Sequence, residues 1–199
     1  MKRAVGGLLL ACILSLGQTA WAGPAQDTLK SDVDAVLSVL RSTKAGDPGR
    51  TERLAKDMES FFDAKELARR TLALNWTKFS PQEQDSFTQA FVQLLENTYV
   101  RRIETYTNEQ VVYLGESPLG DGRVEVSTKI VTSQRQVPIT YRLINGSGAW
   151  KVYDVVIEGV SLVQNYRSQF EQILGQESPA RLIERVKKIE AEGPQGNQK

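Results

Sequence analysis

Histidine is absent from this 199-residue sequence, and cysteine occurs only once, at Cys12. The lack of histidine removes the side chain that proteins use most often as a general base and as a metal ligand. The charges are also balanced, since 25 basic residues stand against 24 acidic ones. Nucleic-acid binders normally carry a clear basic excess. We therefore expect no metal site and no nucleic acid among the partners.

Residues 1–22 have the pattern of a cleavable secretory signal peptide. A basic start precedes an apolar run over residues 4–16, and Ala20 and Ala22 place small side chains where a signal peptidase cleaves. The apolar run is too short to span a bilayer, which takes roughly 20 residues. The pattern predicts an exported protein whose mature chain starts at Gly23.

Cys12 permits a second interpretation of this segment. Leu9-Leu10-Ala11-Cys12 loosely resembles a lipoprotein cleavage box, which would leave an acylated Cys12 as a membrane anchor. The apolar run continues past Cys12 and a good cleavage site follows, which favours the cleavable signal. The mature chain would then contain no cysteine, so a packed core and not a disulfide must hold it together.

Amphipathic helices are predicted for the first half of the mature chain. Apolar residues recur at helical spacing over residues 25–43, and a Gly-Asp-Pro-Gly break at 46–49 precedes a short helix. Asp63 with Glu66 is typical of a helix start. Ser80, followed by proline and by a glutamate three residues on, is a stronger start for a helix that should run to about residue 106.

Strands are predicted where the apolar period changes to two. Segments near 111–113, 124–130, 137–143 and 149–158 alternate or are apolar throughout. Residues 115–122 resemble a longer connection, whereas an Asn-Gly-Ser-Gly sequence at 145–148 predicts a hairpin turn. The last strand is apolar on both faces, so we expect it to be central and covered on both sides.

One domain, residues 23–192, is expected, followed by a disordered polar tail at 193–199. Two further helices are predicted after the strands, the last of them beginning at Ser178-Pro179. The order of helices, strands and helices predicts an α+β fold. A curved antiparallel or mixed sheet of about four strands, wrapped by helices, would enclose a cone-shaped space.

Two blocks of sequence resemble the MlaC (toluene-tolerance) family. The first block is Leu74-Asn75-Trp76, followed by Ser80-Pro81-Gln82-Glu83-Gln84 and by the aromatic and leucine residues from Phe87 to Tyr99. The second runs from Trp150-Lys151-Val152-Tyr153-Asp154 into Glu158-Gly159-Val160-Ser161 and on to Phe170. The second block is long and specific. The resemblance covers about residues 29–189.

The resemblance implies a nuclear-transport-factor-2-like cone with an internal apolar cavity. Members of the family are periplasmic, non-enzymatic carriers of diacyl phospholipids. They exchange lipid with an inner-membrane ABC transporter complex that has an MCE-domain subunit and with an outer-membrane lipoprotein–porin complex. The system maintains outer-membrane lipid asymmetry. The family has no catalytic motif to transfer, and phospholipid is bound as cargo, without a further cofactor.

Candidate site residues follow from the apolar faces and from the resemblance, although each apolar residue also fits an ordinary core. The candidate lipid-binding residues are Phe91, Leu95, Tyr99, Ile103, Tyr106, Val126, Ile139, Tyr141, Leu143, Tyr153, Val155, Val160, Leu162, Tyr166 and Phe170. Candidate headgroup or partner contacts are Arg101, Arg102, Arg142 and Arg167, with Lys129 and Arg135 also among the basic residues that could meet a phosphate. Solvated faces are the alternative for these basic residues.

Two other functions are compatible with the sequence. Asp154 interrupts an apolar strand, and cone-shaped folds host enzymes that use a buried carboxylate. An enzyme of this kind would act on a small apolar substrate through Asp154 or a pocket tyrosine. The alternative is a structural aspartate bonded to a neighbouring turn or helix N-terminus, which the absence of histidine favours. A periplasmic chaperone for apolar tails is the third possibility. The bound ligand distinguishes the three.

Overall fold

The computed structural model describes residues 23–44, 46–103, 106, 109–146 and 148–192. The predicted signal peptide with Cys12 and the predicted tail at 193–199 lie outside the described residues. The elements are α1 (Pro24–Ser42), α2 (Pro48–Phe61), α3 (Ala64–Leu72), the 3-10 helix η1 (Ala73–Lys78), α4 (Pro81–Ile103), β1 (Gln110–Gly120), β2 (Arg123–Val131), β3 (Gln136–Asn145), β4 (Trp150–Ile157), β5 (Val160–Ser161), α5 (Leu162–Leu174) and α6 (Pro179–Glu192). The α+β class predicted from sequence is confirmed.

The strands form one antiparallel sheet in the order β1-β2-β3-β4-β5. The connection predicted at 115–122 is wrong, because β1 pairs with β2 as far as Gly120 and only Asp121 and Gly122 form the turn. Both turn residues have positive φ (52° and 68°), as a tight hairpin requires. Two register shifts in β1 and the presence of Pro118 hide the alternation, and an edge strand tolerates a proline.

Strand β4 is buried on both faces, as predicted, with four consecutive buried residues from Val152 to Val155. It is not central, however. Within the described residues, β3 pairs along one side of β4, and the other side carries just the two-residue strand β5 and an isolated parallel bridge between Phe62 and Val152. The Asp63 amide donates to the Val152 carbonyl at 2.8 Å. The junction of α2 and α3 is therefore fixed directly to the sheet.

The predicted helix starts are confirmed by their hydrogen bonds. The Glu66 amide donates to Asp63 Oδ1 at 2.9 Å and begins α3. At the start of α4 the Ser80 amide donates to Glu83 Oε2 at 2.9 Å, and the Glu83 amide donates back to Ser80 Oγ at 3.3 Å. This reciprocal pair is a capping box. It sets the direction of the longest helix.

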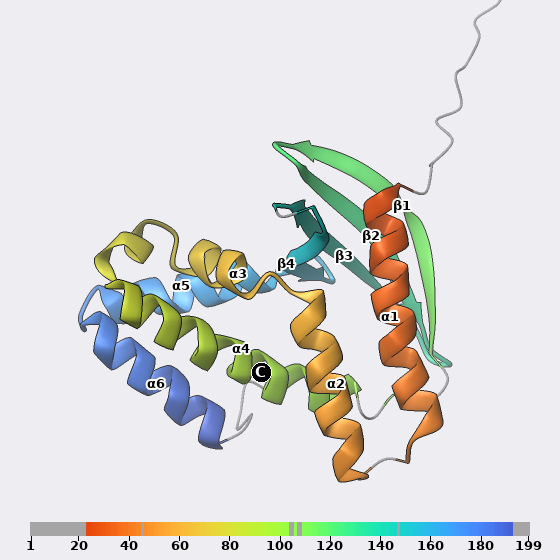
Figure 1. Cartoon of the computed structure of the whole chain (residues 1–199), viewed down its shortest axis with the longest axis horizontal. Coiled ribbons are helices and arrows are strands. Elements are labelled where there is room, and N and C mark those ends of the chain that lie inside the picture. Colours follow the sequence, from red (N-terminus) through yellow and green to blue (C-terminus); the bar gives the residue numbers. More distant parts are fainter. Residues whose placement is uncertain (1–22, 45, 104–105, 107–108, 147, 193–199) are drawn as a thin grey trace, which may run out of the picture.

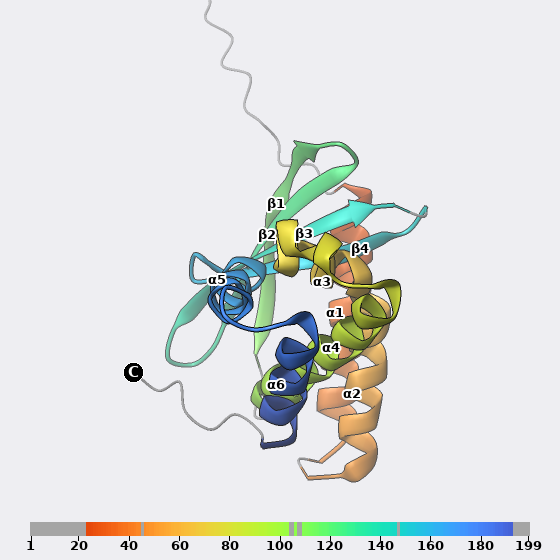
Figure 2. The same ribbon diagram turned by 90° about the vertical axis from the view of Figure 1, so that its left-hand side faces the viewer.

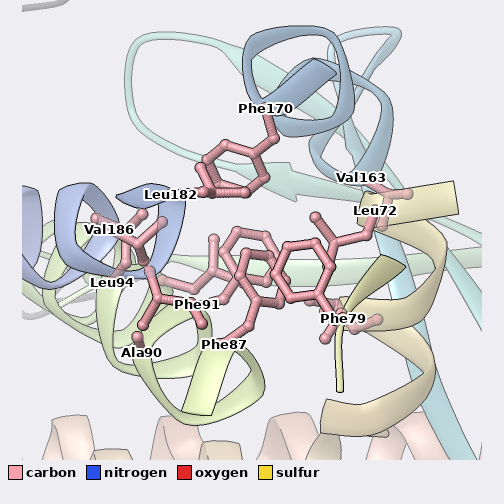
Figure 3. Packing of buried hydrophobic residues seen from close by; sticks show 14 residues of the cluster. Leu72, Phe79, Phe87, Ala90, Phe91, Leu94, Val163, Phe170, Leu182 and Val186 are labelled. Atoms are coloured by element: carbon pink, nitrogen blue, oxygen red, sulfur yellow. The ribbon is translucent and has the colours of Figure 1, made fainter. Parts of the chain in front are cut away.

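Four helices, α3 to α6, pack together around an aromatic core. Phe87 and Phe91 of α4 stack with their ring centroids 5.6 Å apart, and Phe170 of α5 meets both rings edge-on. Leu182 of α6 lies beside Phe170, and Val186 of the same helix lies beside Leu94 (Figure 3). This close-packed region supports α4 but does not include the sheet's inner face.

Helix α1 covers the sheet, while α2 lies between α1 and α4 (Figures 1 and 2). The first half of α1 packs Ala25 and Leu29 onto strand residues such as Val126. Glu116 of β1 accepts the Gln26 amide at 2.8 Å, which places a carboxylate at the positive end of α1. In the described part of the chain, none of the helices combines the length and apolarity needed to cross a membrane.

Candidate functional site

A pocket of about 700 Å³ lies between the sheet and helices α1, α2 and α4. Its size falls within the range of about 300–1,000 Å³ that is usual for ligand sites. Most of its wall is apolar: Val33, Val36, Leu37 and Leu40 of α1; Met58, Phe61 and Phe62 at the end of α2; Phe91, Val92, Leu95, Tyr99 and Ile103 of α4; and Val111, Ile130, Val137, Ile139, Tyr141, Val155 and Ile157 of the strands. Such a wall suits a large apolar ligand.

The pocket exists because the apolar residues form three separate clusters instead of one. One cluster joins α3 to α6, a second joins α1 to the sheet, and a third joins α1, α2 and the end of α4. Side chains at the edges of the second and third clusters, such as Val36, Met58 and Val137, line the pocket and are only partly buried. Interiors are normally close-packed. An unfilled space of this size therefore indicates a binding site for a ligand.

One wall of the pocket is fixed by aromatic contacts between α2 and β3. Phe61 meets Tyr141 edge-on at 5.9 Å and Phe62 edge-on at 4.8 Å between ring centroids. Burial raises the pKa of Tyr141 to about 12. Its hydroxyl is therefore neutral at physiological pH and adds no charge to the wall.

Few charged residues line the pocket, and most of them are acidic. Asp32, Glu59, Glu96 and Glu158 lie there, and Arg135 is the one basic side chain found at the pocket in the described parts of the chain. Burial raises the pKa of Asp32 and of Glu96, and Glu59 adds to the effect at Glu96. Arg135 Nη1 lies 3.2 Å from Glu158 Oε1.

The structure brings nine of the fifteen candidate lipid-binding residues to this pocket. They are Phe91, Leu95, Tyr99, Ile103, Tyr106, Ile139, Tyr141, Val155 and Leu162. They come from α4, β3, β4, the start of α5 and the segment after α4. Sequence periodicity on separate elements therefore selected faces that meet in space. Direct contact of these residues with lipid stays a prediction.

The other six candidates lie away from the pocket. Val126 and Leu143 pack in the cluster between α1 and the sheet, and Tyr166 and Phe170 pack in the α3–α6 cluster. The other two are Tyr153, whose ring lies under the Arg70 guanidinium at 4.1 Å, and Val160, which is exposed in β5. Their apolar faces are occupied by the protein itself or turned to solvent.

The candidate arginines do not gather at the pocket. Arg142 pairs with Asp154 at 3.1 Å and with Glu125 at 3.4 Å on the sheet. Arg167 donates twice to the Arg70 carbonyl and ties α5 to α3. The side chains of Arg101 and Arg102 lie outside the described residues. Among the candidate basic residues whose side chains are described, Arg135 lines the pocket, and Arg142 and Arg167 do not. Contact of Arg142 or Arg167 with a headgroup or a partner stays a prediction.

Asp154 holds the start of α5 in place. Its carboxylate accepts hydrogen bonds from Ser161 Oγ at 2.7 Å, from the Val163 amide at 3.1 Å and from Arg142 Nη1 at 3.1 Å. It does not line the pocket. The structural alternative predicted for this residue matches these contacts. Among the described residues, no group of three or more acidic, cysteine or histidine side chains is arranged to hold a metal ion.

Sequence reasoning missed the contribution of α1 and α2 to the pocket. Val36 and Leu37 of α1 and Met58 and Phe61 of α2 line it. The helical spacing over residues 25–43 was a signal for an apolar face. It could not tell a face that packs on the sheet from one that faces an open space.

A large apolar pocket between the sheet and the helices of an α+β fold is typical of proteins that bind small-molecule ligands. The family model described as MlaC protein matches residues 30–188. The chain belongs to the MlaC family.

Named relatives agree with this assignment, and a solved structure shares the fold. The intermembrane phospholipid transport system binding protein MlaC of Haemophilus influenzae is 26% identical over 168 residues, which cover 81% of this chain and 77% of that protein. The toluene tolerance protein ttg2D of Pseudomonas putida is 26% identical over 111 residues, which cover 54% and 51% of the two chains. The phospholipid-binding protein from Ralstonia solanacearum, solved in complex with a phospholipid, superimposes with a TM-score of 0.78 at 24% identity, covering 85% of this chain and 98% of that one.

Proposed function

We propose that this chain is a periplasmic phospholipid carrier that holds the acyl chains of a diacyl lipid in the pocket. The observation that carries the proposal is the apolar pocket of about 700 Å³ within a member of the MlaC family. The names of the relatives, which refer to phospholipid transport and phospholipid binding, support the choice of ligand. The chain needs no cofactor and breaks no bond, and phospholipid is its cargo.

A carrier of this kind solves an energetic problem. Exposing two acyl chains of about 16 carbons each costs about 25 kcal/mol, at about 0.8 kcal/mol per methylene. A barrier of that order allows about 10⁻⁶ unassisted events per second. An apolar pocket lowers the barrier because the chains move from one apolar environment to another. The pocket need only imitate the bilayer interior.

Export and partners complete the proposal. The signal-peptide pattern at residues 1–22 supports a periplasmic location. There the carrier exchanges lipid with an inner-membrane ABC transporter complex containing an MCE-domain subunit, and with an outer-membrane lipoprotein–porin complex. This exchange serves outer-membrane lipid asymmetry. The pocket offers no source of free energy for direction, so direction comes from the ATP-driven partner.

Lipid extraction of the purified mature chain tests the proposal. The protein is prepared without detergent, extracted with organic solvent and the extract analysed by mass spectrometry. We expect diacyl phospholipid at a fixed ratio to protein, and none after the protein has been unfolded, washed and refolded without lipid. A small non-lipid substrate would favour an enzyme, and a bound peptide would favour a chaperone. An empty pocket after repeated preparations would contradict the proposal.

A further inference from the structure

Arg135 and Glu158 form an ion pair at the pocket, on two turns that the sheet brings together. Arg135 closes the turn from β2 to β3, where its amide donates to Thr132 Oγ1 at 3.0 Å. Glu158 follows β4, and its amide donates to the Pro138 carbonyl at 3.0 Å. Arg135 Nη1 lies 3.2 Å from Glu158 Oε1. Hydrogen bonds donated by the two backbone amides therefore fix both turns, whichever partners the side chains of Arg135 and Glu158 take.

The pair itself is easily opened. The side chains of Arg135 and Glu158 are 65% and 49% exposed. Exposed ion pairs add little stability, because water screens them and two long side chains must be ordered. Two apolar residues of the pocket lie close to these charges in the chain: Val137 is two residues after Arg135, and Ile157 directly precedes Glu158. A lipid whose acyl chains fill the apolar part can therefore present its headgroup to this pair.

We propose that this pair selects the headgroup: Arg135 binds the lipid phosphate and Glu158 binds an ammonium group. The pocket then prefers zwitterionic, amine-bearing phospholipids to anionic ones. The inference rests on the proposed function, since it concerns which phospholipid the same pocket holds. A guanidinium matches phosphate oxygens well. When the lipid phosphate binds Arg135, Glu158 loses its cationic partner. An ammonium group of the lipid replaces that partner, whereas a glycerol headgroup leaves the Glu158 carboxylate next to the phosphate without a cation.

The other charged residues of the pocket also disfavour anionic headgroups. Asp32, Glu59 and Glu96 also line it, and Arg135 is the only basic side chain to do so within the described ranges. A net anionic headgroup would enter a site where, among the residues that the structure describes, acidic side chains outnumber basic ones. Like charges in such surroundings oppose binding, and opposite charges fix the orientation of a ligand.

Competition between two lipids with identical acyl chains tests this selection. Delipidated protein is incubated with vesicles that contain equal amounts of phosphatidylethanolamine and phosphatidylglycerol, and the bound lipids are quantified by mass spectrometry. We expect the wild-type protein to enrich phosphatidylethanolamine by roughly two- to fivefold, the range of an exposed charge interaction. Glu158→Gln should lower this ratio clearly towards one, because it removes the carboxylate that binds the ammonium group. Arg135→Gln should lower total lipid occupancy while phosphatidylethanolamine stays enriched.

A matched control is available at another hairpin of the same sheet. Arg123 Nη2 lies 2.8 Å from Asp121 Oδ2 at the turn between β1 and β2, and neither residue lines the pocket. Arg123→Gln should therefore leave both the ratio and the occupancy unchanged. A wild-type ratio of one, or an enrichment that Glu158→Gln does not alter, would overturn the selection while leaving the carrier function standing. Failure of the wild-type protein to bind either lipid would instead contradict the carrier function.

Discussion

The ring of Phe61 meets the ring of Tyr141 edge-on, with 5.9 Å between their centroids. Phe61 ends α2 and Tyr141 lies in β3, so this contact joins a helix to the sheet at the pocket wall. The adjacent bridge from Phe62 to Val152 fixes the same junction through the backbone. The wall is thus held by contacts that do not require the pocket to be filled.

The contact between the two rings predicts a measurable coupling energy. Edge-to-face aromatic pairs contribute about 0.5–1.5 kcal/mol beyond the area they bury. Phe61→Leu, Tyr141→Leu and the double variant should therefore show a coupling of that size in denaturant unfolding of the delipidated protein. Tyr141→Phe retains the ring and serves as the control. A coupling near zero would mean that the rings meet without stabilising the wall.

Two positions on β3 distinguish the pocket from solid core. Val137 is partly buried and lines the pocket, whereas Leu143 is 1% exposed and does not line it. Leu143→Trp should destabilise the delipidated protein by about 1–3 kcal/mol through overpacking. Val137→Trp should leave its stability nearly unchanged but reduce the extra stability that bound lipid confers. Thermal unfolding with and without lipid measures both effects. Equal destabilisation by the two variants would contradict the assignment of Val137 to the pocket and of Leu143 to the core.

The sequence predicted the elements better than their arrangement. Capping patterns at Asp63 and Ser80 located two helix starts correctly, because those hydrogen bonds are local. The extension of β1 through Pro118 was missed, since register shifts there disrupt the alternation on which the prediction depended. The position of β4 in the sheet was also mispredicted, because the apolar pattern of a strand does not show which strands pair with it.

For a similar reason, the sequence predicted only part of the pocket lining. Apolar periodicity identifies a face that avoids water, and Tyr141 and Leu143 belong to one apolar face of the same strand. Tyr141 lines the pocket, whereas Leu143 is buried in the cluster that joins α1 to the sheet. This difference arises from how the elements pack in three dimensions. The periodicity of either element does not encode it.

Asp154 should matter for stability and not for lipid binding. Its carboxylate accepts three hydrogen bonds, among them one from the Val163 amide at the start of α5. Asp154→Asn weakens this set, so we expect a loss of about 1–3 kcal/mol in the free energy of unfolding. Lipid content per folded molecule should not change. Glu125→Gln, which alters the more exposed partner of Arg142, should cost less than about 1 kcal/mol. Loss of a substrate turnover without loss of stability in Asp154→Asn would support an enzyme.

Glu96 predicts a dependence of stability on pH. Burial raises its pKa above the ordinary value of 4.5, and Glu59 adds to the shift. The folded state therefore binds this proton more tightly than the unfolded state, and the ionised carboxylate is destabilising at neutral pH. Glu96→Gln should stabilise the protein by about 0.5 kcal/mol or less at pH 7. The gain should disappear as the pH falls through the raised pKa to about 4.5.

Denaturant unfolding at pH 7 and near pH 4 measures this difference. Glu52→Gln makes the same change of charge at an exposed position of α2 and serves as the control. A gain from Glu96→Gln that was equal at both pH values would show that the carboxylate is not disfavoured by its surroundings.

Photolabelling shows whether acyl chains occupy the pocket. A phosphatidylethanolamine that carries a diazirine on one acyl chain is loaded into the protein and irradiated, and the labelled peptides are identified by mass spectrometry. We expect labels on pocket residues from several elements, such as Leu37, Met58, Tyr99 and Val137, and their loss in competition with unlabelled phospholipid. Labels confined to the exposed apolar residues Val112 and Leu114 of β1, with the pocket unlabelled, would contradict the occupancy of the pocket by acyl chains.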